Sequence, residues 1–271
     1  MAHIFVLVHG GWLGGWCWRR VADRLRERGH VVFTPTLTGL GERSHLLSAG
    51  IDLDTHIADV VNVVKWERLN DVVLCGHSFS GFVISGVAEQ IAPAIRSIVF
   101  LDAFVPSDGD SIQGLAGDAI RDGVRGAMQR GSAGVLPRSA ETFGVNEADR
   151  AWVDGLCVRQ PIRTLTSPIA LKGARERIAR KAYIRAKGYN NHAFDRAFAA
   201  AQSDQTWRCY QMPCGDDDHG RYAGTSRRAF AASRGLKRSN RSDPSRLMRG
   251  RRSTSQVRYS CIAALASPPR S

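Results

Sequence analysis

The sequence lacks three features that would each define a class of protein. Its six cysteines include no C-x-x-C pair, which argues against a disulfide framework or a zinc site and favours reduced thiols in a cytoplasmic protein. No apolar stretch approaches the roughly 20 residues of a membrane-spanning helix, so we expect no membrane association. The apolar run at residues 4–8 has neither a basic segment before it nor a cleavage site after it, and it predicts a core strand rather than a signal peptide.

Acidic residues are nearly absent from the end of the chain. The net charge is +13, but residues 220–271 carry +12 of it and residues 1–219 only +1. The segment 220–271 is rich in arginine and serine and has little periodicity, which predicts a disordered tail. Such a tail could act as a nucleic-acid arm. Because residues 1–219 are nearly neutral, we expect no nucleic-acid partner.

Short apolar runs alternate with amphipathic segments over residues 1–105 and again over 181–219. This alternation predicts a mostly parallel sheet with helices on both faces, an α/β fold with one core. Residues 106–180 interrupt the alternation and predict a helical cap inserted over the carboxyl edge of the sheet. The predicted strands cover residues 4–8, 30–34, 71–75, 95–101, 181–185 and 207–212.

A short motif follows the third predicted strand. Residues 76–81 read Gly-His-Ser-Phe-Ser-Gly and precede a predicted helix, the context of a nucleophile elbow. We therefore predict Ser78 as a nucleophile and the backbone N–H of Phe79 as an oxyanion donor. Ser80 stands where a second glycine is usual. The alternative is an ordinary Gly/Ser turn that opens a helix.

The first predicted strand runs into His9-Gly10-Gly11-Trp12. Glycines at this place let backbone N–H groups approach a substrate. We predict that the Gly11 N–H is the second oxyanion donor; the alternative is a turn that requires positive φ. Trp12 and Phe104 lie near the carboxyl edge of the sheet. They are predicted to bind substrate in an apolar pocket, with core packing as the alternative.

Residues 9–18 together with Gly76-His77-Ser78 resemble the α/β-hydrolase subgroup that contains plant methylesterases, hydroxynitrile lyases and bacterial carboxylesterases, including pyrethroid-cleaving ones. The resemblance runs from about residue 3 to residue 215. It implies the α/β-hydrolase fold and a Ser-His-Asp mechanism without cofactor or metal. In the lyases a threonine typically follows the first histidine. Gly10 occupies that position here, as in the esterases, and Leu13 stands where a second histidine is often found.

A serine nucleophile needs a base, and the base needs an orienting acid. In this family the histidine follows the last strand in a Gly-His-Asp turn, but Asp216 holds that position here and the nearest histidine is His219. We predict His219 as the base. Asp102 follows the predicted strand 95–101 and is predicted as the acid; Asp195 is the alternative, and a turn aspartate that caps backbone N–H groups is another.

These residues predict a serine hydrolase that acts on carboxylic esters of small apolar substrates. The alternatives are a lyase with the same residues and a catalytically impaired ligand-binding homologue, which the displaced histidine favours. A further hypothesis is that the gene is out of frame from about Asp216. Residues 219–225 can be encoded as CAT GGT CGA TAT GCC GGA ACG. Without its first nucleotide that string encodes Met-Val-Asp-Met-Pro-Glu, which resembles the segment after Gly-His-Asp in bacterial members.

Overall fold

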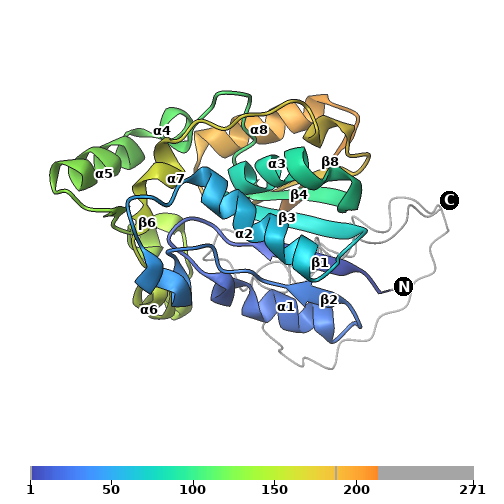
Figure 1. The fold of residues 1–271 in the computed structure, drawn as a ribbon, viewed down its shortest axis with the longest axis horizontal. Coiled ribbons are helices and arrows are strands. Elements are labelled where there is room, and N and C mark those ends of the chain that lie inside the picture. Colours follow the sequence, from blue (N-terminus) through green and yellow to red (C-terminus); the bar gives the residue numbers. More distant parts are fainter. Residues whose placement is uncertain (1, 187, 213–271) are drawn as a thin grey trace, which may run out of the picture.

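The computed structural model describes residues 2–186 and 188–212. Within them a six-stranded parallel sheet has the order β2-β1-β3-β4-β7-β8 (Figure 1). This sheet confirms the predicted strands, with ends that differ by at most three residues. His219 and the predicted basic tail lie outside the described residues. The strands are β1 (Ile4–Val8), β2 (Val31–Phe33), β3 (Val72–Ser78), β4 (Ile95–Ala103), β7 (Lys181–Ala186) and β8 (Trp207–Met212).

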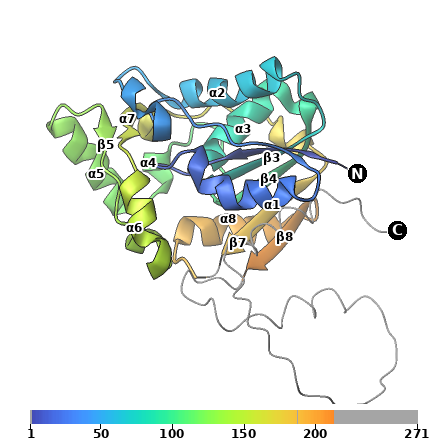
Figure 2. The same ribbon diagram turned by 90° about the horizontal axis from the view of Figure 1, so that it is seen from below.

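Helices cover both faces of the sheet, as predicted (Figures 1 and 2). The buried side chains of α2, α3 and α8 pack in one apolar cluster with alternate strand residues, whereas those of α1 pack in a second cluster with the residues between. In β1, for example, Val6 faces the first cluster and Leu7 the second, because successive strand side chains point to opposite faces. The four helices are α1 (Arg19–Arg26), α2 (Leu53–Trp66), α3 (Ser80–Ile91) and α8 (His192–Ser203).

Local signals explain where two of these helices begin and end. Asp52 accepts a hydrogen bond from the backbone N–H of Thr55 at 3.1 Å, which starts α2 with a capping box. Gly29 has φ +78° just beyond α1, a left-handed conformation that glycine commonly adopts where a helix ends. Short 3-10 helices fill several connections: η1 (Gly15–Trp18), η2 (Gly41–Leu46), η3 (Ala92–Ala94), η4 (Ala140–Phe143) and η5 (Arg175–Arg177).

Residues 106–180 contain four α-helices. They also contain one small antiparallel strand pair, and the sequence did not predict this pair. Figures 1 and 2 show these elements together at the end of the sheet opposite the N-terminus. No helix in the described ranges is both long and apolar enough to cross a bilayer. The elements are α4 (Ile112–Leu115), α5 (Asp118–Gln129), α6 (Glu147–Leu156) and α7 (Ile162–Thr166), with β5 (Gly134–Val135) paired to β6 (Gln160–Pro161).

Candidate active site

Ser78 ends β3 in a strained backbone conformation. Its φ is +54°, in the left-handed region that residues other than glycine rarely adopt. The tight turn depends on two small neighbours. A Cβ on Gly76 would lie 2.6 Å from the carbonyl oxygen of Ser80, and one on Gly81 would lie 1.8 Å from that of Phe104. The segment therefore has the geometry of a nucleophile elbow, with the strain held by close backbone packing.

Ser80 explains the departure from the usual second glycine. Its side chain is fully buried, and its hydroxyl donates a hydrogen bond to the carbonyl oxygen of His9. A glycine would lack this bond. The elbow is thus tied directly to the turn that follows β1.

His9 fixes a peptide plane in that turn. Its Nε2 accepts the backbone N–H of Leu37 at 3.1 Å, so its Nδ1 carries the proton and donates to the carbonyl oxygen of Gly10 at 2.8 Å. Burial lowers the pKa of His9 to about 4, and the ring stays neutral at pH 7. The Gly10 carbonyl shares its peptide with the Gly11 N–H, so this bond orients the predicted oxyanion donor.

Gly10 is required for space, whereas a Cβ on Gly11 would meet only ordinary contacts, and neither glycine has positive φ. A Cβ on Gly10 would lie 2.9 Å from Nδ1 of His77 and 3.3 Å from Cβ of Ser78. In this turn the residue with positive φ is Trp12, at +61°. The alternative explanation of the glycines, a turn that requires positive φ at their positions, is therefore wrong.

Two backbone N–H groups at the nucleophile stay without a protein acceptor in the part of the chain that the structure describes. They belong to Gly11 and Phe79, the two predicted oxyanion donors. The N–H of Trp12, by contrast, donates to Oε1 of Gln160 at 2.8 Å. The N–H groups of Gly11 and Phe79 are therefore available to a ligand, which is compatible with their predicted role.

A cavity of about 190 Å³ lies against Ser78 and is walled by both the core and the residues between 106 and 180. Gly11, Asp102 and Trp12 line it. Its other walls are mainly aromatic, with Trp16, Phe143, Trp152, Tyr189 and Phe194 among them.

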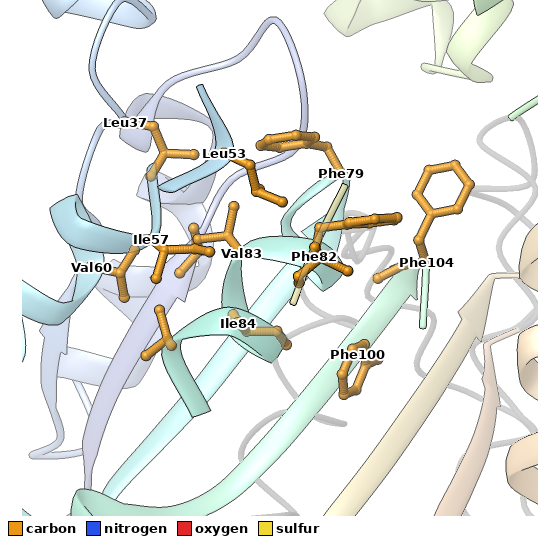
Figure 3. Packing of buried hydrophobic residues seen from close by; sticks show 14 of the residues in the cluster. Leu37, Leu53, Ile57, Val60, Phe79, Phe82, Val83, Ile84, Phe100 and Phe104 are labelled. Carbon is orange, nitrogen blue, oxygen red and sulfur yellow. The ribbon is translucent and has the colours of Figure 1, made fainter. Parts of the chain in front are cut away.

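Phe104, predicted to bind substrate or else to pack in the core, does not line this cavity, and its contacts fit the alternative of core packing. Its ring packs 6.1 Å from that of Phe82 and 4.9 Å from that of Phe194, in the core on the α3 side of the sheet (Figure 3). The Phe79 side chain also lies in this core. The predicted role of Phe79 as an oxyanion donor therefore concerns its backbone N–H alone.

Helix α6 supplies walls that the sequence reasoning missed. Trp152 packs edge-on against Trp16 at 4.9 Å between ring centres. Arg20 of α1 binds Asp149 of α6 through two hydrogen bonds of 2.7 Å each. The only local signal in this region is Asn146, whose side chain caps α6; nothing in it indicates which partner the helix meets.

Asp102 lines the same cavity as Ser78 and is buried at the end of β4, with φ +40°. Its Oδ1 accepts Nη1 of Arg185 and the backbone N–H of Ala186, both at 2.9 Å. Asp102 therefore also makes the backbone contact expected of a turn aspartate. Asp195, the alternative acid, is largely exposed on α8, binds Nε of Arg185 at 2.9 Å and does not line the cavity. The sequence reasoning missed Arg185.

Three histidines of the described residues, His9, His56 and His77, lie at or beside the turn after β1 and the elbow. His9 and His56 are fully buried, with pKa values that burial lowers to about 4. His77 lines the cavity, edge-on to Trp18 at 6.4 Å between ring centres. The predicted base, His219, lies outside the described residues. Over the described ranges, no three His, Cys, Asp or Glu side chains are placed to hold a metal ion.

Comparison with known proteins extends these observations. A family model described as the alpha/beta hydrolase family matches residues 5–243. A carbendazim hydrolyzing esterase of Nocardioides sp. (strain SG-4G) is 43% identical over 223 residues, covering 79% of this chain and 92% of that protein. An alpha-hydroxynitrile lyase of Arabidopsis thaliana is 32% identical over 105 residues, covering 38% of this chain and 41% of the lyase.

Solved structures show the same fold. An extracellular alpha/beta-hydrolase from a Paenibacillus species superposes with a TM-score of 0.69 at 24% identity, covering 78% of this chain and 89% of that one. A pyrethroid hydrolase from Sphingobium faniae gives 0.60 at 20% identity, covering 79% and 90%. At these identities the likeness is one of fold.

Proposed function

Because this chain belongs to the alpha/beta hydrolase family and is of the esterase type, we propose that it cleaves carboxylic esters of small apolar substrates with Ser78 as nucleophile. The observation that carries the proposal is the left-handed Ser78 at the end of β3, beside a cavity and next to two N–H groups without protein acceptors. Those groups, on Gly11 and Phe79, suit the negative oxygen of a tetrahedral intermediate.

The proposed reaction has two halves and uses no cofactor. Oγ of Ser78 bonds to the carbonyl carbon, His219 takes the hydroxyl proton, and the C–O bond to the alcohol breaks as the alcohol receives that proton. Water then adds to the acyl-enzyme by the same route, the acid departs and Ser78 regains its proton. Asp102 orients the imidazole from the end of β4, on the wall that it shares with Ser78.

The cavity supports a small substrate with a flat apolar part. Its volume of about 190 Å³ and its tryptophan-rich walls fit a compact aromatic or aliphatic ester. The charged groups in its wall include Arg20 and Asp149, which neutralise each other. The relative named for carbendazim hydrolysis is consistent with a small ester-like substrate.

The space at Gly10 favours ester hydrolysis over lyase chemistry. A side chain there would start 2.9 Å from His77 and 3.3 Å from Ser78, so the threonine expected of a lyase requires both neighbours to move.

Stopped-flow reaction with 4-nitrophenyl acetate tests the proposal. We expect a burst of nitrophenol from acylation of Ser78, followed by steady turnover. Ser78→Ala should abolish the burst and lower turnover about 10³-fold or more, while Ser203→Ala, which removes an exposed hydroxyl on α8, should change neither. A burst without turnover would indicate an impaired enzyme that lacks its base. Absence of both burst and turnover in the unaltered chain would indicate a ligand-binding homologue and refute the proposal.

A further inference from the structure

One side chain from outside the core holds the backbone beside the oxyanion donors. Gln160 of β6 is fully buried, and its Oε1 accepts the backbone N–H of Trp12 at 2.8 Å. We propose that Gln160 is a positioning residue that sets the direction of the Gly11 N–H toward the substrate oxygen. The proposal rests on the proposed function and assigns part of its transition-state stabilisation to the segment 106–180.

The orientation of the Gln160 amide is fixed by its other partner. Its Nε2 lies 2.7 Å from Oγ1 of Thr164, whose hydroxyl lies 2.6 Å from the carbonyl oxygen of Pro161. The single hydroxyl proton of Thr164 goes to that carbonyl, so Thr164 must accept from Gln160. The amide nitrogen therefore faces Thr164, and the amide oxygen faces Trp12.

Trp12 needs to be held because its backbone is strained. A non-glycine residue is strained in the left-handed region, and Trp12 has φ +61°. Three hydrogen bonds restrain it. Its indole N–H donates to the carbonyl oxygen of Val135 at 3.0 Å, its carbonyl accepts the N–H of Val158 at 3.0 Å, and its own N–H is held by Gln160.

Among the described residues, only the hydrogen bond to Gln160 holds the peptide between Gly11 and Trp12. The preceding peptide, which carries the Gly11 N–H, is held by His9 through the Gly10 carbonyl at 2.8 Å. Gly10 and Gly11 have no side chains that restrict their dihedral angles, so their N–H directions depend on these two outer bonds. A Cβ on Gly11 would lie 3.5 Å from Oε1 of Gln160, so the amide oxygen lies close to the Gly11 backbone.

Loss of the acceptor should therefore affect the transition state more than substrate binding. Without it, the Trp12 N–H is either left buried without a partner, which is costly, or the Gly11–Trp12 peptide rotates to relieve the strain at Trp12. Rotation next to a glycine turns the Gly11 N–H away from the substrate oxygen. Because an oxyanion donor acts mainly as charge develops on that oxygen, the effect should appear in kcat.

Gln160→Met tests this in the full chain, because it keeps the side-chain length and removes the acceptor. We expect kcat for 4-nitrophenyl acetate and the rate of Ser78 labelling by a fluorophosphonate both to fall about 10- to 100-fold, below the loss for removing a donor outright. KM should stay within about 2-fold. Gln160→Glu keeps an oxygen toward Trp12 and should recover most of the rate.

Asp154→Ala is the matched control, because Oδ1 of Asp154 accepts the N–H of Ala140 at 2.6 Å, another side-chain bond to backbone within residues 106–180. It should lower the melting temperature by a similar amount and leave kcat unchanged. Thr164→Val covers the case in which Gln160→Met does not fold; it should lower kcat about 3- to 10-fold by freeing the amide. A folded variant of either kind with normal kcat, or with a changed KM only, would overturn the proposal. Failure of the unaltered chain to be labelled would instead overturn the proposed function.

Discussion

Acidification should destabilise this fold well above the pH at which carboxylates titrate. Burial lowers the pKa of His9 and of His56 to about 4, whereas unfolding returns both to about 6.5. Between pH 6.5 and pH 4 the unfolded chain therefore binds more protons, and the folded state loses stability as the pH falls. Each histidine should account for about 2 kcal/mol between pH 7 and pH 5. The two together reach about 4 kcal/mol, a large part of the 5–15 kcal/mol typical of a domain.

Urea unfolding at pH 7, 6 and 5, followed by tryptophan fluorescence, measures this loss. The variant His56→Gln can keep the hydrogen bond that Nε2 of His56 makes to the Thr38 carbonyl at 2.9 Å while removing its titration. Its loss between pH 7 and pH 5 should be about 2 kcal/mol smaller than that of the unaltered chain. His45→Gln, at an exposed position in η2, should leave the loss unchanged. Equal pH dependence in the unaltered chain and His56→Gln would refute the reasoning.

Two further outcomes follow from the site. Asp102→Asn should lower turnover about 10²- to 10⁴-fold and Asp195→Asn by much less, because only Asp102 lines the cavity with Ser78; the opposite ranking in kcat measurements would make Asp195 the acid. Translating the chain from Asp216 in the alternative frame should raise both esterase turnover and melting temperature, and equal turnover by the two chains would show that His219 is a competent base.

The elbow and the sheet were predictable because their signals are local. The apolar run before Gly76, the small residues around Ser78 and the helical segment after them are contiguous in the sequence, and backbone sterics at such a turn admit few alternatives. Phe104 lies next to this turn but does not line the cavity. Its backbone passes so close to Gly81 that no Cβ fits between them, and its ring lies in the core beside Phe82.

The contacts that complete the site were not predictable, because they join residues far apart in the sequence. Gln160 and Trp12 are 148 residues apart, and Arg185 and Asp102 are 83 apart. Neither pair has a spacing or a periodicity that marks it. Gln160 lies in a two-residue strand, too short for a hydrophobic pattern, and Arg185 looks in the sequence like the charged end of an ordinary strand.

Arg185 limits what Asp102 can do as the proposed acid. Its buried guanidinium lies 2.9 Å from Oδ1 of Asp102, so part of the negative charge of Asp102 is already compensated inside the protein. A carboxylate stabilises an imidazolium less when another cation shares it. Orientation of the base should therefore count for more here than its electrostatic stabilisation. The same bonds tie the end of β4 to Ala186 and, through Arg185, to α8, so the carboxylate of the proposed acid is held in one position.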